Sequence, residues 1–550
     1  MATEKKEFDK DIAKESNSHE FSRSKTRSKR GSRKSKPNQL KSKTNDISWY
    51  STDPSIVRDA ASFPFSRAVG TKIGFNFSHN YFNNQSSSNY RDFASHSAPG
   101  IYRLTVAPTI GYSTDKTSPV NIAATALYSF IRHANSGHAN YDAPDLMLYL
   151  LATSQVYSIL NWCERIYGSM LMYSQRNRFV PRYLLLSDGI DVDDFAANLA
   201  NFRYGLNIAI NKISALAVPN TLSLFNRHAF LFQNYYIEGP SIKDQIYYLS
   251  PGGFSKFQVN AQSQVGELRY QALNRTPTTP LGVSAILSYL NSFIDALLEQ
   301  EDIGIMSGDI LKAYGENIIK LRSLDEVYAL EFVQDDVFLN QIKNCTPIVS
   351  SDINVTGIGD IGQDTSGNIV AKPYVSYPTT NPTLANSVLD ILGSESVITF
   401  NKQDITPEDV VEATRLHVSI KNITDGGVTR PYIFTGTEIP LVATTFRIDR
   451  KSTLNAALQG DVVPYVYWND ASATTGLMRA MSALCCAGYF KYSNAVFPVW
   501  DSNSDNQWDG VIPHFDMDNY SMLSVEEIER LHEACIINMV HVPAIAKAYQ

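Results

Sequence analysis

The spacing of apolar and polar positions divides the chain into segments of different character. Residues 1–45 have almost no apolar residues and cannot bury enough surface to offset the entropy cost of ordering, so we predict that they are disordered. Helical spacing prevails in much of 46–344 and returns in 451–550, whereas 345–450 alternates short β-branched runs with Gly, Pro, Asn and Asp turns. The pattern predicts an α+β protein with a predominantly α-helical domain and a smaller β-containing module.

Three helices are predicted in the first helical block. Ser118 followed by Pro119 is typical of a helix start, and this helix covers 118–134. The second covers 144–174; because its apolar residues surround the axis, we predict a central buried helix. The third covers 192–218 and stops before a proline.

Shorter patterns predict further helices and strands. Three more helical stretches are predicted between Leu281 and Lys343, one of them starting at the capping-box spacing of Ser323-Leu-Asp-Glu326. A helix over 525–549 starts at a similar box, Ser524-Val-Glu-Glu527. The remaining predicted helices are 384–392, 406–415 and 473–490, and the predicted strands are 69–77, 101–106, 346–355, 368–377, 429–434 and 441–448.

Charge is distributed unevenly along the chain. The net charge is −7, yet residues 1–45 hold 14 basic and 6 acidic residues, so they carry +8 and the rest of the chain carries −15. Between residues 21 and 43 the chain has ten basic residues and no acidic one: Arg23, Lys25, Arg27, Lys29, Arg30, Arg33, Lys34, Lys36, Lys41 and Lys43. A basic arm on an acidic body indicates a polyanionic partner for the arm.

The arm has a physical mechanism for binding RNA. Flexible Lys and Arg side chains neutralise phosphates and release counterions, which gives salt-sensitive binding without sequence preference. No aromatic residue lies between Ser22 and Lys43, so base stacking is not predicted. The other interpretation of such a basic run is a nuclear-localisation signal or a solubility tail.

The cysteines and the apolar runs exclude several classes of protein. The five cysteines form no C-x-x-C pair, so neither a disulfide framework nor a zinc site is predicted and a reducing compartment fits best. No run of about 18 apolar residues and no secretory signal is present. We therefore predict no stable membrane insertion and expect the sequons at Asn354 and Asn422 to be unused. The cysteines are Cys163, Cys345, Cys485, Cys486 and Cys535.

One glycine motif needs a test against its context. Residues 357–362 match G-x-G-x-x-G, but a dinucleotide site needs a helix directly after the glycines and an acidic residue about 20 positions later. The chain continues instead with turn residues up to Asn368. We predict a loop.

Two groups of residues are candidate metal ligands. His133 and His138, with Asp142 and Asp145, lack the spacing of three or four that ligands on one helix face need, so a hydrogen-bonded interhelical turn is the preferred interpretation. The second group lacks the spacing of a calcium loop and precedes a helix, so we predict a capping role for Asp188, Asp191, Asp193 and Asp194. No G-x-S-x-G elbow, H-E-x-x-H pair or P-loop is present, and we predict no catalytic, cofactor-binding or metal-binding residue.

One stretch resembles a known family. Residues 129–152 read SFIRHANSGHANYDAPDLMLYLLA, and this segment, continued by Gln155-Val-Tyr157 and Arg165-Ile-Tyr-Gly168, resembles the picobirnavirus capsid proteins. The chain length and the basic N-terminus match that family as well.

The resemblance implies a coat protein of a small non-enveloped virus with a segmented double-stranded RNA genome. It implies an icosahedral shell built from dimers, a mostly helical shell domain, a smaller projecting domain and a fold unlike the jelly roll. It further implies that the N-terminal segment is associated with packaged RNA; in some members that segment is removed by proteolysis, but no cleavage signal is identified here.

These implications define the expected domain plan. The arm is 1–45, the shell domain is 46–344, the module at 345–450 is the projection, and 451–550 returns to the shell domain. The expected partners are further copies of the chain and viral RNA, in virions assembled in the host cytoplasm.

Two other classes of function stay open at this point. A cellular RNA-binding or nuclear protein with a basic tail would stay monomeric or small when purified. An enzyme whose site forms only in the fold would show a deep pocket with convergent titratable residues. Particle size by electron microscopy or light scattering separates these two classes from a coat protein.

Overall fold

The computed structural model describes most of the chain after residue 99. The described residues are 100–135, 137, 139–172, 180–240, 244–349, 353–376, 396–447, 487–493 and 519–540, the single positions 55, 59 and 542, and the backbone of 72–74, 95–97, 448–449, 457–463, 496–500 and 508–513. The chain forms two units, Met1–Phe65 and Ser66–Gln550. The helices and strands described below belong to the second unit.

A six-stranded open sheet runs through the centre of this unit. Its strand order is β17 (Ala457–Val463), β16 (Glu438–Asp449), β3 (Ile101–Pro108), β5 (Ile246–Pro251), β4 (Tyr235–Ile237) and β8 (Phe332–Val333). β3 pairs in parallel with β5 and antiparallel with β16, so that Leu104 lies beside Leu249 on one side and Ala443 on the other. All residues of β5 are buried, as expected for a strand that is covered on both faces of its sheet.

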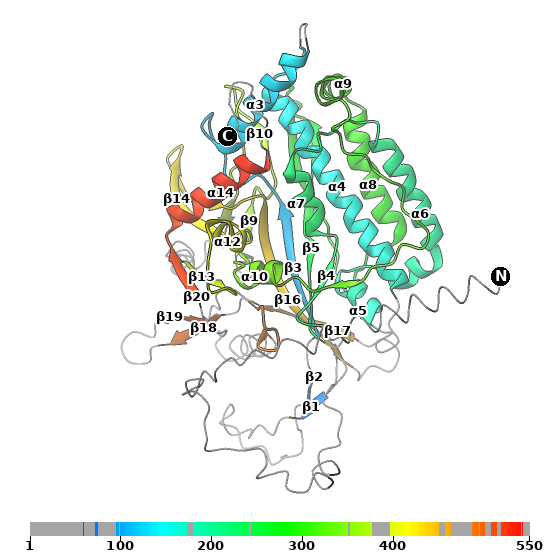
Figure 1. Ribbon diagram of the computed structural model, residues 1–550, viewed down its shortest axis with the longest axis vertical. Helices are drawn as coiled ribbons and strands as arrows, with labels where there is room; N and C mark the ends of the chain where they lie inside the picture. The colour runs from blue at the N-terminus through cyan, green and yellow to red at the C-terminus, as the bar shows by residue number, and fades with distance from the viewer. Residues whose placement is uncertain are drawn as a thin grey trace, which may run out of the picture. The chain divides into compact units, whose positions relative to one another are not determined.

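Helices cover one side of the sheet (Figure 1). The long helix α4 (Ala143–Leu171) contacts α3 (Pro119–Ala134), α6 (Val192–Ile213), α7 (Ser223–Leu231), α8 (Val283–Leu298) and the hairpin of β6 (Gly253–Val259) and β7 (Gly266–Ala272). Every residue of α4 from Leu146 to Leu160 is buried, which confirms the prediction of a central buried helix. α5 (Val180–Ser187) and α9 (Glu301–Tyr314) complete this layer.

α3 begins and ends where the sequence predicts, whereas α4 and α6 begin at the predicted positions and end earlier. α3 begins after Ser118 with Pro119 in its first turn. The Asp145 carboxylate accepts the backbone N–H of Asp142 at 3.1 Å and so closes the start of α4. α4 ends at Leu171 and α6 ends at Ile213, both several residues before the predicted limits.

Smaller elements lie on the other side of the central sheet (Figure 1). A four-stranded sheet has the order β14 (Ser419–Asp425), β15 (Val428–Phe434), β12 (Tyr374–Ser376), β9 (Asn354–Thr356), and α14 (Val525–Met539) contacts β14. The two-stranded sheets are β13 (Ser396–Phe400) with β20 (Asn519–Leu523), β10 (Gly362–Gln363) with β11 (Ile369–Val370), β18 (Val496–Trp500) with β19 (Trp508–Pro513), and β1 (Lys72–Gly74) with β2 (Ser95–Ser97). The short helices are α10 (Asp336–Lys343) and α12 (Pro407–Ala413).

The α+β class is confirmed, as is the absence of a jelly-roll arrangement in the described sheets, because the main sheet is mixed and covered by helices. The predicted helix at Ser323 is wrong: residues 321–331 are irregular with a turn at 326–327, and the third helix of that stretch is α10, which is capped by Asp335. The predictions for 384–392 and for most of 473–490 lie outside the described residues, as do Cys485 and Cys486.

Candidate functional site

The ten predicted RNA-binding residues of the arm, from Arg23 to Lys43, lie outside the described residues, so their role stays a prediction. The glycine motif at 357–362 is a loop, as predicted. It joins β9 to β10 with no helix after it, and Gly357 and Gly359 adopt positive φ angles of +74° and +61°. A Cβ atom on Gly359 would lie 2.3 Å from Ser255 Oγ, so this glycine allows the loop backbone to approach the Ser255 side chain closely.

Most of the aspartates that were weighed as metal ligands bind backbone amides instead. The Asp191 carboxylate accepts the N–H groups of Asp193 and Asp194 at the start of α6, as predicted for a cap. The Asp194 carboxylate accepts the N–H of Val283 at 2.7 Å and so caps α8 rather than its own helix. His133 is exposed near the end of α3, and His138 lies outside the described residues.

Asp188 contradicts the capping prediction. It is fully buried and binds two arginines from distant parts of the chain. Its carboxylate accepts hydrogen bonds from Arg165 Nη2 at 3.2 Å, Arg275 Nη2 at 2.9 Å and Trp162 Nε1 at 2.8 Å. The Ser250 hydroxyl donates to the same carboxylate at 2.5 Å. We call these five residues the Asp188 cluster; it joins α4, the turn after α5, strand β5 and the chain beyond β7.

The electrostatics of the Asp188 cluster favour its charged form. Burial raises the pKa of the Asp188 carboxyl, but Arg275, Arg165 and the hydrogen bonds outweigh burial and hold that pKa below its ordinary value. Aromatic rings complete the surroundings: the Arg275 guanidinium lies 4.7 Å from the Trp162 ring centroid, and Arg165 lies 5.1 Å from that of Tyr248. The cluster fixes the helical layer to the central sheet.

A second buried ion pair joins α7 to the central sheet. The Arg227 Nε atom donates to Glu438 Oε1 at 2.9 Å, and Glu438 is fully buried at the start of β16. Burial raises the pKa of Glu438, but the charge of Arg227 and its hydrogen bonds outweigh burial and keep that pKa below its ordinary value. Beside the pair, His228 Nε2 donates to the Thr437 carbonyl at 3.1 Å.

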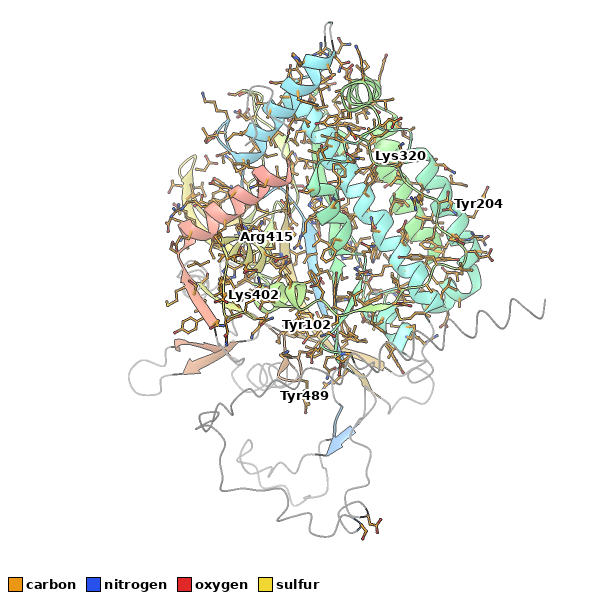
Figure 2. The ribbon with its side chains drawn as sticks, viewed as in Figure 1. Tyr102, Tyr204, Lys320, Lys402, Arg415 and Tyr489 are labelled. Carbon is orange, nitrogen blue, oxygen red and sulfur yellow. The ribbon has the colours of Figure 1, made fainter. Side chains whose placement is uncertain are left out.

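A third cluster connects α14 to the chain between α12 and β14. The Nε2 atom of His532 donates to the carbonyl of His417 at 2.9 Å, and the Nδ1 atom of His417 donates to the carbonyl of Asn344 at 3.0 Å. Arg415 Nη2 lies 3.4 Å from His532 Nδ1, between α14 and the neighbouring strands (Figure 2). Because a carbonyl only accepts, the ring nitrogen in each of these bonds carries a proton.

These buried histidines predict a stability that falls in mild acid. Burial lowers the pKa of His228 and of His417 to about 4 and lowers that of His532 well below its ordinary value. Between about pH 6.5 and 4 the unfolded chain therefore binds more protons than the folded chain, so stability is complete above pH 6.5 and is lost as the pH falls. We expect His228 and His417 each to contribute about 2 kcal/mol to the loss of unfolding free energy between pH 8 and pH 5.

Chemical denaturation at the two pH values measures this loss. His417→Gln should reduce the loss by about 2 kcal/mol, whereas the exposed His133→Gln should leave it unchanged. Equal losses of unfolding free energy in these two variants would contradict the assignment of the acid sensitivity to His417.

Two cavities open on the described surface. The larger, of about 400 Å³, lies between the β6–β7 hairpin and α8; the smaller, of about 190 Å³, lies between the segment 112–119 and α14. Within the part of the chain that the structure describes, no group of three or more His, Cys, Asp or Glu side chains could hold a metal ion. In that same part no helix is long and apolar enough to cross a membrane.

The buried ionic clusters pair charges from distant parts of the chain and hold its layers together. Comparisons with known proteins identify the family. The family described as "Picobirnavirus, Capsid protein" matches residues 49–457, and the chain belongs to this family. It is therefore a viral capsid protein, a structural component of the virion.

Two relatives extend the likeness over nearly the whole chain. The capsid protein precursor of human picobirnavirus (strain Human/Thailand/Hy005102/-) is 26% identical over 527 residues, which are 91% of each chain. The X-ray crystallographic structure of the picobirnavirus capsid is similar in fold with a TM-score of 0.74 at 19% identity, covering 92% of this chain and all of the solved one.

Proposed function

We propose that the chain assembles through dimers into an icosahedral shell around double-stranded RNA, and that the arm residues 21–43 hold the RNA inside. Membership of a capsid family supports self-assembly. The charge distribution carries the proposal for RNA: an arm segment of +8 on a remaining chain of −15 attracts phosphates at the arm and repels them from the wall. The role is structural rather than catalytic, and assembly takes place in the host cytoplasm.

The domain plan is part of this proposal. The shell wall comprises the helical layer and the central sheet, and a projection comes from within 345–450. In that range β16 belongs to the central sheet, whereas β9, β12, β14 and β15 form a sheet of their own. We propose this four-stranded sheet as the base of the projecting part.

Deleting residues 1–45 tests the role of the arm. We expect closed particles to form with far less RNA, because the deleted segment contains almost no apolar residues that could stabilise contacts between copies. Electron microscopy would report closure, and the ratio of absorbance at 260 nm to that at 280 nm would report RNA.

A second deletion provides the matched control. Residues 1–20 contain four lysines and six acidic residues, so removing only this part leaves all ten basic residues from Arg23 to Lys43. These particles should keep their RNA. Particles lacking 1–45 with a full RNA content would refute the proposed role, and a shorter chain that stops at dimers would show that the arm is needed for assembly.

A further inference from the structure

The middle of α6 is unusually poor in charge for a helix at the surface. Residues 195–211 contain a single charged side chain, Arg203. A surface helix ordinarily turns charged residues to solvent, as α14 does with exposed Glu526, Arg530 and Glu533. The outer face of α6 therefore lacks the feature that marks a helix in permanent contact with water.

The exposed residues of α6 form a regular seam. Asn201, Tyr204, Ile208 and Asn211 are all exposed, follow one another at intervals of three, four and three residues, and lie after the kink at Asn198. This spacing places them in a line along one side of a helix, as in helices that pair with a second helix. Tyr204 is 70% exposed and Ile208 is 39% exposed, and Figure 2 shows Tyr204 at the outer side of α6, pointing away from the other helices.

Charges beside the seam are paired within the chain. Arg203 Nη2 lies 3.7 Å from Glu326 Oε2, and Lys212 Nζ lies 3.1 Å from Asp295 Oδ1. The seam is therefore electrically neutral, while the chain beyond the arm carries −15. Two copies of such an acidic body repel one another over most of their surface and approach with least repulsion at a neutral face.

We propose that the α6 seam is a contact between two copies of this chain, which pair antiparallel about a twofold axis; the inference rests on the proposed shell function. In a twofold contact, residue i meets residue j and j meets i. The seam fits this rule when Tyr204 lies opposite Ile208 of the partner subunit. The same register places Asn201 opposite Asn211 of the partner subunit, so that apolar side chains meet at the centre and amides meet on either side.

The seam is too small to be a whole interface and would form the centre of a larger one. The part of α6 after the kink at Asn198, residues 199–213, is about 22 Å long, and one such helix pair supplies the centre of an interface of about 1,200–2,000 Å². Tyrosine suits this place because it buries a large surface at a small cost in side-chain entropy. Because this face is electrically neutral, it offers no charge that a basic partner such as the arm could bind.

Single charged substitutions test the seam. Tyr204→Glu and Ile208→Glu should each weaken dimer formation roughly 30-fold or more, as loss of a central contact does, and should abolish particles. Val337→Glu is the matched control, because Val337 is 46% exposed and lies in α10 rather than beside α6. Sedimentation velocity would measure dimers, electron microscopy would measure particles, and circular dichroism melting would confirm that each variant folds.

A double variant tests the register. In the antiparallel pair, Tyr204→Asp with Ile208→Lys places opposite charges face to face and should restore dimers that each single substitution removes. In a parallel pair the same variant opposes like charges and stays monomeric, which would overturn the antiparallel arrangement. Wild-type assembly by both glutamate variants would overturn the α6 contact and leave the shell function intact, whereas a wild-type chain that forms no particles would overturn the shell function itself.

Discussion

Replacing Asp188 with alanine is expected to lower the free energy of unfolding by about 3–5 kcal/mol, because the change leaves two buried arginines without their counter-charge. Arg165 is fully buried and the Arg275 side chain is 4% exposed, so neither can reach water without opening the helical layer. The Trp162 and Ser250 donors lose their acceptor at the same time. A loss of this size is a large fraction of the about 5–15 kcal/mol by which native proteins are ordinarily stable.

A neighbouring aspartate supplies the control for this substitution. Asp193 also binds an arginine, Arg182, at 2.8 Å, but the two side chains are 78% and 43% exposed. Asp193→Ala should cost about 1 kcal/mol or less, since solvent screens an exposed pair. Urea denaturation of both variants measures the difference. Similar losses in the two would show that the Asp188 cluster does not hold the helical layer to the sheet.

The affinity of the arm for duplex RNA is expected to fall by about three to five orders of magnitude between 50 and 200 mM salt. If most of the ten basic residues between 21 and 43 neutralise phosphates, the slope of log affinity against log salt should be about −6 to −9. Changing Arg27, Lys29, Arg30 and Arg33 to glutamine removes four of these charges and should make the slope shallower by about 3 to 4.

A salt titration of an arm peptide against two duplexes of unrelated sequence measures both quantities. Without aromatic residues from Ser22 to Lys43, the arm has no stacking groups, so the two duplexes should give the same slope and affinity. A strong preference for one duplex would reject the electrostatic tether and favour specific recognition.

Helix starts that depend only on neighbouring residues could be predicted from the sequence. Ser118 with Pro119 defined the start of α3, and Ser524 with Glu527 defined the start of α14, because a cap depends on residues within one turn. The failure at Ser323 has a tertiary cause: Leu324 N–H donates to Asn207 Oδ1 at 2.7 Å and Leu330 N–H donates to the carbonyl of Gly168, so these groups bind α6 and α4 instead of a helix of their own.

The buried ionic clusters were not predicted, although one signal was present. Arg165 stands in a helix that is apolar on all sides, and a charged residue in such a place requires a buried partner. The sequence does not reveal which acid is that partner, because Asp188 and Arg275 approach only when α4, β5 and the chain beyond β7 pack together. Strands β4 to β7 and helix α7 were likewise not predicted, since their pairing is with distant residues.

The order of the central strands governs when a newly synthesised chain becomes a finished subunit. β3 leaves the ribosome early, but Ile101 pairs with Ile246 on one side and with Phe446 on the other. One edge of β3 therefore stays open until β16 has been made, late in translation. Chains that end before β16 lack this strand pairing, so we expect a subunit to fold completely only after β16 has been translated.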